Sequence, residues 1–394
     1  MPNPFALSGI DFLKKQQGLS GRSILAGILD LGVAAVPDLP GLIQSYGLTG
    51  DSFVPVTPSD PLGHGTPCSG ILIGNGSCSK GQFQGIAPQA KLISVQLPAV
   101  QRGEQMIFEG SSDLVAKAIR FFIQQKDAHH DANGQPLPLR LIAISIGKKF
   151  EDNGEPYQPP EHNPINLAVQ AAWHAGIFVV CAAGNYGPRS GTILSSPAND
   201  PLVLTVGATD GSQDTREQSI LHKESSRGPT REGHPKPDLL APGGGLTTTK
   251  APGSILDRKG QLVREFMRLS PQDLLERLTA NPRAFFPLFE FTGNSQLASP
   301  DLYERAKKLL PAERPIGEHY TTFGATSGAC MVAGGGILLL LELANRLTLE
   351  ISPDQMKSIL VRTCDKLKME RDSAQGAGHI NFRRAYFELL KLKR

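Results

Sequence analysis

The chain contains 394 residues, of which 40% are hydrophobic and 20% are charged, as is typical of a soluble globular protein with a substantial core. Its formal net charge is only +3, and no basic run is interleaved with aromatic residues, so the composition does not indicate a nucleic-acid-binding protein. No apolar stretch reaches the ~18 residues of a membrane span, because the apolar segment 332–343 is too short and its glycines fit a core helix, so we expect no association with a membrane.

The first predicted element is a buried strand over residues 23–29, an apolar run of strand length. Asp30 lies at its end, just before Gly32 allows the chain to turn. A carboxylate at the end of a buried strand costs free energy unless it has a partner, so Asp30 is a candidate functional residue. Taken alone, it is more simply an aspartate that begins a turn.

His64 is the next candidate, because it lies among small residues in the motif Gly63-His64-Gly65-Thr66. Small neighbours let the start of a helix approach a substrate closely, and they leave the imidazole reachable. An isolated histidine is more often solvated or part of a core, but these flanking residues favour a functional role.

Strand and helix patterns then alternate along the chain. A continuous apolar strand begins at Gly176 and ends in Gly184-Asn185, and helices are predicted over residues 112–125, 166–175, 332–347 and 353–363. This alternation predicts an α/β fold with a mainly parallel central sheet flanked by helices in three layers. In such folds ligands bind where strands end and helices begin.

Ser327 follows a turn at Gly324 and opens a helix of small residues. A serine at a helix N-terminus gains from the positive end of the helix dipole, and its backbone N–H can face a developing negative charge. Taken alone, the same pattern is explained by an ordinary N-cap serine.

Taken together, these sites resemble the subtilase family of serine endopeptidases. The acid, the base and the hydroxyl occur in the order Asp, His, Ser that subtilisin shows, and Asn185 ends a strand from which its amide can reach a carbonyl oxygen under attack. The resemblance implies that Asp30 orients the imidazole, His64 acts as general base and acid, Ser327 is the nucleophile and Asn185 is the oxyanion donor. Further motifs in family order cover most of the chain: Gly85-Ile86-Ala87-Pro88, Ala143-Ile144-Ser145-Ile146-Gly147, Ser225-Ser226-Arg227-Gly228-Pro229, Lys236-Pro237-Asp238 and Gly376-Ala377-Gly378-His379.

The resemblance also implies where substrate and ions bind. An extended polypeptide substrate would pair by strand addition with the backbone of two segments, Ser145, Ile146, Gly147 and Ala182, Ala183, Gly184. The chemistry would need no cofactor. A structural calcium ion is a further expectation, because Asp38 matches a segment that supplies a ligand in many subtilases and the loop 75–82 offers carbonyl groups. That loop lacks acidic residues, so the alternative is an ordinary turn aspartate at Asp38.

Two departures from the family pattern affect the site. The family usually has Thr or Ser directly after the acid, where this chain has Leu31, so the orientation of His64 must rely on other donors. Near the nucleophile, the family's Gly-Thr-Ser-Met-Ala becomes Ala325-Thr326-Ser327-Gly328-Ala329. Neither change removes a reacting atom, but the second can reshape the side of the site that holds the leaving group.

Residues 253–317 lie outside the common pattern and are interpreted as a largely helical insertion, about 65 residues long, within a single subtilisin-like domain that spans residues 1–394. Ser270-Pro271 and Ser299-Pro300 each predict a helix start. Four aromatic residues lie between these two helix starts: Phe285, Phe286, Phe289 and Phe291. Either they form the insertion's own small core, or they line the substrate groove, cover the active site as a lid or dock a protein partner. Because the chain re-enters the domain just before Ser327, we expect the insertion to lie beside the cleft and to control specificity.

The N-terminal residues 1–10 lack a basic segment followed by an apolar core and a small-residue cleavage site, so no secretory signal is expected. The likeness to the catalytic domain begins near Gly18, so either the protein is cytoplasmic and made without a pro-domain or an upstream piece is missing, and we favour the former. The five cysteines are expected to be reduced. The expected function is an intracellular serine endopeptidase that processes specific peptides or proteins, and the alternative is a catalytically silent subtilase-fold binding or regulatory protein.

Overall fold

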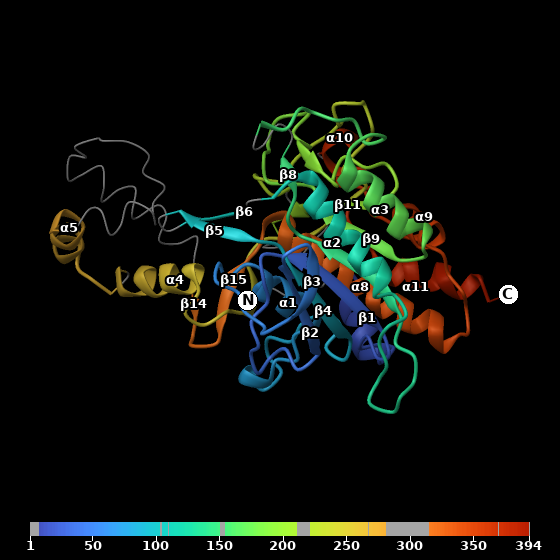
Figure 1. The fold of residues 1–394 in the computed structure, drawn as a ribbon, viewed down its shortest axis with the longest axis horizontal. Helices are drawn as coiled ribbons and strands as arrows, with labels where there is room; N and C mark the ends of the chain where they lie inside the picture. The colour runs from blue at the N-terminus through green and yellow to red at the C-terminus, as the bar shows by residue number, and fades with distance from the viewer. Residues whose placement is uncertain are drawn as a thin grey trace.

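A parallel sheet forms the centre of the molecule (Figure 1). The computed structural model describes residues 8–102, 105–108, 110–149, 154–210, 221–266, 268–280, 315–368 and 370–393. The strands of the sheet are β1 Leu25–Asp30, β2 Leu42–Thr49, β3 Ser52–Val56, β4 Lys91–Gln96, β7 Leu139–Ile144, β9 Phe178–Ala182, β11 Leu204–Thr209 and β12 Leu239–Pro242. Their order is β12-β11-β9-β7-β1-β4-β2-β3, and every neighbouring pair is parallel except β2 and β3.

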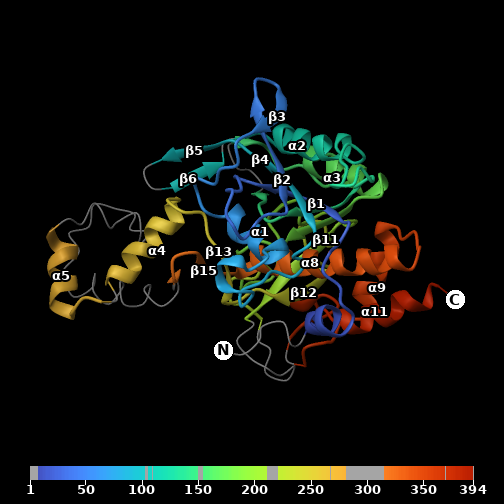
Figure 2. The ribbon, with the colours of Figure 1, turned by 90° about the horizontal axis from the view of Figure 1, so that it is seen from below.

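Helices cover both faces of this sheet. They are α1 Gly65–Ile73, α2 Ser112–Gln124, α3 Pro164–His174, α8 Ala325–Arg346, α9 Pro353–Arg362, α10 Asp372–Gln375 and α11 Phe382–Lys391. Figure 2 shows α2 and α3 on one face and α8, with α9 and α11 beyond it, on the other. The predicted three-layer α/β fold with a mainly parallel sheet is therefore confirmed.

Smaller elements connect these layers. They are the short helices η1 Phe12–Gln16 and η2 Ser77–Ser79, the hairpin β5 Ala99–Arg102 with β6 Gln105–Phe108, and the pair β8 Lys148–Lys149 with β10 Ser195–Ser196.

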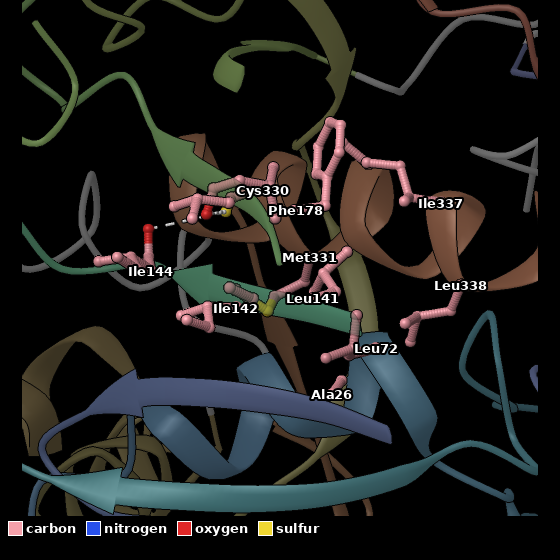
Figure 3. Close-up of a cluster of buried hydrophobic side chains, with 14 of the residues drawn as sticks. Ala26, Leu72, Leu141, Ile142, Ile144, Phe178, Cys330, Met331, Ile337 and Leu338 are labelled. Atoms are coloured by element: carbon pink, nitrogen blue, oxygen red, sulfur yellow. Dashed lines mark hydrogen bonds between the residues drawn. The ribbon is translucent and has the colours of Figure 1, made fainter. Parts of the chain in front are cut away.

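Helix α8 is buried in the hydrophobic core on one face of the sheet. Figure 3 shows Met331, Ile337 and Leu338 of this helix packed against side chains from β7 and α1. Glycines allow close packing on two sides of α8: a Cβ atom built on Gly334 would lie 3.2 Å from Cδ1 of Leu72 in α1, and one built on Gly336 would lie 2.0 Å from Cζ of the buried Phe382 ring in α11. Among the described residues, α8 is the one helix long and apolar enough to cross a bilayer, and it is fully buried inside the protein.

The helices predicted over residues 112–125, 166–175 and 353–363 are confirmed as α2, α3 and α9 to within a few residues. The third helix, α8, begins at Ala325, so the predicted start at residue 332 is wrong, whereas the expectation that a helix opens at Ser327 agrees with the structure. Its first turns contain glycine and other small residues that favour a turn by intrinsic propensity, but complete burial against the sheet stabilises them as helix.

Two helices of the predicted insertion are described, α4 Ile255–Phe266 and α5 Pro271–Ala280. The predicted start of α5 is confirmed, since the Ser270 hydroxyl accepts the backbone N–H of Asp273 at 3.1 Å. The chain returns through a three-stranded antiparallel sheet of β13 Leu246–Thr249, β15 Tyr320–Phe323 and β14 Pro315–Ile316. The predicted second helix start at Ser299 and the four phenylalanines lie outside the described residues.

Candidate active site

Asp30, His64 and Ser327 come from three different elements and meet in one place. Asp30 is the last residue of β1, His64 directly precedes α1, and Ser327 lies in the first turn of α8. His64 Nδ1 lies 2.9 Å from Asp30 Oδ2, and His64 Nε2 lies 3.2 Å from Ser327 Oγ. This order of contacts, carboxylate to imidazole to hydroxyl, is the one that general-base activation of a serine requires.

Asp30 is buried and receives donors from two further groups. Its Oδ1 accepts the backbone N–H of Leu31 at 2.7 Å, and its Oδ2 accepts the Ser145 hydroxyl at 2.6 Å. A hydroxyl donor to the Asp30 carboxylate therefore comes from Ser145, which follows β7, the strand paired with β1. The sequence analysis assigned Ser145 only to substrate binding, because nothing in the sequence connects its side chain to Asp30.

A second buried carboxylate, Asp60, positions the backbone around His64. Its Oδ1 accepts the N–H groups of Gly63 at 2.7 Å and His64 at 3.3 Å, and its Oδ2 accepts that of Thr66 at 2.8 Å. These are N–H groups at the start of α1 that have no partner within the helix, so Asp60 satisfies the helix N-terminus. The sequence analysis missed Asp60, although an acidic residue ahead of a predicted helix start is a usable signal.

The small residue after His64 has a steric reason. A Cβ atom built on Gly65 would lie 2.0 Å from the carbonyl oxygen of Gly32 and 3.1 Å from Cβ of Asp30. Glycine at this position therefore lets the start of α1 approach the end of β1, which is what brings the imidazole to the carboxylate.

The charge of His64 is set by two opposing effects. Burial disfavours the imidazolium, but the adjacent Asp30 carboxylate favours it, and the result is that the pKa of His64 is raised well above its ordinary value of 6.5. The His64 side chain is still 20% exposed, whereas that of Asp30 is 2% exposed. The imidazole is therefore partly accessible to solvent, whereas the carboxylate that orients it is buried.

Ser327 is held by two acceptors and by an unusual turn. Its Oγ lies 3.2 Å from His64 Nε2 and 3.2 Å from the backbone oxygen of Ser145. Ala325 begins the helix with φ of +56°, a left-handed conformation that glycine adopts more easily than alanine. The family glycine replaced by Ala325 thus occupies a position where backbone strain is stored two residues before the hydroxyl.

Asn185 follows β9 and reaches the same turn. Its Oδ1 accepts both the backbone N–H of Thr326 at 3.2 Å and the Thr326 hydroxyl at 2.7 Å. These contacts fix the amide oxygen toward Thr326, so the Nδ2 group is the end left to donate a hydrogen bond beside Ser327.

The predicted substrate segments lie at the ends of neighbouring strands. Ser145, Ile146 and Gly147 follow β7, whereas Ala182 ends β9 and is followed by Ala183 and Gly184. Because β7 and β9 pair in parallel, both segments leave the sheet at the same edge. Ser195 lies against the first segment, since a Cβ atom built on Gly147 would lie 2.8 Å from its Oγ.

Cys68 lies beneath the histidine, with its Sγ 4.0 Å from His64 Nδ1 and 3.5 Å from the Ser145 hydroxyl. Burial raises the pKa of its thiol, so the neutral form is favoured. Asp30, His64 and Cys68 are the one group of three potential metal ligands in the described parts of the chain. Their carboxylate and imidazole are hydrogen-bonded to each other, which is the arrangement of an acid–base pair rather than of ligands around an ion.

Asp38, the residue predicted as a calcium ligand, is surrounded by donors. Its Oδ1 accepts the Ser77 hydroxyl at 2.9 Å and the backbone N–H of Cys78 at 2.8 Å. Burial opposes ionisation of this carboxyl, but hydrogen bonds, chiefly from Cys78, outweigh it and lower its pKa. N–H and O–H groups directed at the carboxylate do not fit a cation site, which needs converging oxygen acceptors, so the turn interpretation accounts for Asp38.

Comparisons with known proteins agree with this fold and geometry. Residues 21–378 match the model of the subtilase family. The serine protease AprX of Bacillus subtilis (strain 168) is 30% identical over 375 residues, which cover 94% of this chain and 68% of that protein. The major intracellular serine protease of the same organism is 29% identical over 238 residues, which cover 59% of this chain and 62% of that protein.

Solved structures show the same fold. Fervidolysin from Fervidobacterium pennivorans, described as a keratinolytic enzyme related to subtilisin, has a TM-score of 0.62 at 19% identity, covering 97% of this chain and 45% of that one. Sphericase has a TM-score of 0.62 at 21% identity, covering 95% of this chain and 97% of that one. The chain therefore belongs to the subtilase family and is a subtilisin-like serine endopeptidase.

Proposed function

We propose that this subtilase hydrolyses peptide bonds through an acyl-enzyme formed on Ser327. The observation that carries the proposal is the continuous series of contacts from Asp30 through both ring nitrogens of His64 to Ser327 Oγ. As Ser327 Oγ bonds to the peptide carbonyl carbon, its proton passes to His64 Nε2. The same proton passes to the leaving amine when the C–N bond breaks, and water then repeats the sequence to release the acid.

Asn185 and the backbone N–H of Ser327 stabilise the negative charge on the carbonyl oxygen in this proposal. The Thr326 contacts to Asn185 Oδ1 support it, because they hold the amide in place before the charge develops. Extended substrate pairs with the backbone of Ser145–Gly147 on one side and of Ala182–Gly184 on the other, where the sheet edge is open.

The substrate of the proposed reaction is a polypeptide, processed inside the cell. Support for the cytoplasm comes from the similarity to a relative named as an intracellular serine protease and from the five cysteines, all of which are free thiols in the structure. Separation of cytosol from the extracellular medium, followed by active-site labelling of each, tests this location: label found outside intact cells would contradict it.

The insertion at residues 253–317 remains a candidate surface for a protein partner. The alternative to the proposed acyl-enzyme is that Ser327 is not activated as a nucleophile. A fluorophosphonate probe distinguishes the two, because it reacts covalently only with an activated serine. We expect the folded protein to be labelled, Ser327→Ala to abolish labelling, and Ser52→Ala, at an exposed serine of β3, to retain it. Absence of label on folded wild-type protein would contradict the acyl-enzyme on Ser327.

A further inference from the structure

Two hollows flank the proposed triad and share no lining residue. One, of about 270 Å³, is lined by Ile146, Gly147 and Lys148 together with Leu31 and Phe108. The other, of about 510 Å³, lies between Gly63, the segment Phe323 to Ala325 and the start of α4. Because the first contains the backbone proposed to pair with the acyl part of the substrate, the second lies on the side where the leaving group departs.

The start of the insertion forms one wall of this second hollow, and it is fixed directly to the segment that carries His64. The backbone N–H groups of Ile255 and Leu256 donate to the carbonyl oxygens of Pro61 at 2.9 Å and Leu62 at 3.0 Å. Gly63 leaves room for this contact, since a Cβ atom there would lie 2.4 Å from Ser254 Oγ. The wall therefore has a defined position relative to the general base.

One pair of charged groups that lines the hollow is already partnered. Lys250 Nζ lies 2.6 Å from Asp257 Oδ1, with the two side chains 9% and 4% exposed, and Asp257 Oδ2 also accepts the backbone N–H of Gly253. A buried pair that is satisfied in this way offers no free charge to a ligand.

The remaining lining is mixed: it includes His222, Lys223, Glu224, Ser254, Thr321 and Thr322, and its large apolar side chains are Leu256 and Phe323. Leu256 and Phe323 are half-buried side chains that line the hollow, and the Phe323 ring centroid lies 5.2 Å from that of His64. Glycines occupy several of the other lining positions. The part of the lining formed by Leu256 and Phe323 therefore matches a bulky apolar side chain.

We propose that α4 of the insertion completes a leaving-group subsite, in which Leu256 and Phe323 bind a bulky apolar side chain of the residue that follows the scissile bond. This inference rests on the proposed acyl-enzyme reaction and specifies its substrate: polypeptides with an apolar residue directly after the cleaved bond. Specificity on this side comes from the insertion, whereas the acyl side is built by the strands of the sheet.

Partitioning of the acyl-enzyme tests this subsite without any contribution from the acyl side. N-acylated peptide methyl esters, whose leaving group is methanol, acylate the full-length protein, and phenylalaninamide or glycinamide is then added. In the transfer step the amine nitrogen bonds to the acyl carbon, the Ser327 ester bond breaks, and the amine proton returns through His64 to Ser327 Oγ. The measured quantity is the ratio of amide product to acid product for each added amine.

We expect wild-type protein to prefer phenylalaninamide to glycinamide by about tenfold, which is the factor expected from burying one large apolar side chain. Leu256→Ala should lower this preference by about fivefold, and Leu256→Asp should shift it toward argininamide. Leu167→Ala, at an exposed leucine of α3, is the matched control and should keep the wild-type preference.

Equal partitioning of phenylalaninamide and glycinamide by wild-type protein would overturn the subsite while leaving the acyl-enzyme mechanism intact. An unchanged preference in both Leu256 variants would also overturn it. Absence of any methyl ester turnover is a different result, since it would overturn the proposed function and the subsite with it.

Discussion

The imidazole of His64 must be neutral to accept a proton, yet its environment favours the charged form. Burial works against protonation, but the Asp30 carboxylate outweighs it and raises the pKa of His64 well above 6.5. Since the protonated base is inactive, kcat/KM should rise with pH, and the midpoint of this rise should lie above pH 6.5. Ester hydrolysis measured from roughly pH 6 to pH 10 checks this. A plateau reached below pH 6.5 in protein shown by circular dichroism to be folded would contradict it.

The Ser145 hydroxyl donates a hydrogen bond to the buried acid, at 2.6 Å from Asp30 Oδ2. Ser145→Ala should lower kcat/KM by about tenfold, because a hydrogen bond to a charged group contributes about 1.5 to 3 kcal/mol and only part of it is specific to the transition state. The loss also leaves more negative charge on Asp30, so the pKa of His64 should rise and the pH profile should move to higher pH.

Ser94→Ala is the matched control for this variant, because the Ser94 hydroxyl is also buried and bonds to the Ser45 hydroxyl at 2.7 Å, on β4 and away from the triad. Its pH profile should coincide with that of wild type. If Ser145→Ala lowers the rate but leaves the profile in place, the hydroxyl has a packing role and does not tune the acid.

At the scale of elements, sequence patterns predicted what depends on local chemistry. Helix α9 begins at Pro353 as predicted, directly after the cap residue Ser352, whereas α3 begins at Pro164, two residues before the predicted start, after the cap residue Asn163. The pattern predicted the apolar part of α8 from residue 332, and the earlier start was indicated only by the helix N-terminus expected at Ser327.

The residues of the site divide in the same way, into those that local motifs reveal and those that depend on tertiary contacts. Asp30, His64, Asn185 and Ser327 stand in short local motifs, so they were identified from the sequence. The supporting groups Ser145 and Asp60 act through contacts that exist only after β7 has paired with β1 and the start of α1 has approached β1. A single sequence records no such pairing, which is why the side-chain role of Ser145 was missed.

Two glycines of α8 allow a comparison within one buried helix. A Cβ atom on Gly336 would lie 2.0 Å from the Phe382 ring, whereas one on Gly334 would lie 3.2 Å from a terminal methyl group of Leu72. Gly336→Ala should destabilise the protein by about 2 kcal/mol or more, because the overpacked ring cannot move away. Gly334→Ala should be neutral or stabilising by up to about 1 kcal/mol, since alanine is the better helix former and the methyl group can shift.

Urea unfolding of the two variants beside wild type measures these differences, provided that the slopes of the transitions agree. Equal losses of stability in both variants would show that the clash with Phe382 is relieved by movement of α11, and the packing argument would then fail.

For the whole molecule, the contacts that matter most join segments far apart in the sequence. The insertion is tied to the segment before His64 through Pro61 and Leu62, and the N-terminal segment is tied to α8 and α11. Arg346 donates to the backbone oxygen of Gly18 at 2.8 Å, and the Tyr386 hydroxyl donates to the Gln17 side chain at 2.8 Å. The entry into β1, which ends in Asp30, is therefore positioned by the C-terminal helices.

Glu342 of α8 is only 3% exposed, and it connects this helix to the N-terminal segment. Its Oε2 accepts the backbone N–H groups of Ser20 at 2.7 Å, Gly21 at 2.7 Å and Arg22 at 3.2 Å, and its Oε1 lies 2.6 Å from Arg346. Glu342→Gln keeps the size and shape of the side chain. Its amide nitrogen, however, must face either the backbone N–H groups of residues 20–22 or the Arg346 guanidinium, and it cannot accept a hydrogen bond from either. Because a buried charged partner is lost, the free energy of unfolding should fall by about 3 kcal/mol.

The same variant should expose the N-terminal segment before the sheet unfolds, since these backbone N–H groups lose their acceptor at the point where the chain enters β1. Limited proteolysis of Glu342→Gln that also carries Ser327→Ala, to prevent self-cleavage, should therefore cut near residues 18–22 faster than in the Ser327→Ala parent. Glu350→Gln, at an exposed glutamate just beyond α8, is the matched control and should change neither the urea midpoint nor the cleavage rate. If the urea midpoint and the cleavage rate of Glu342→Gln match those of the control, the N-terminal segment is held by its apolar contacts, and the Glu342 carboxylate does not fix it to α8.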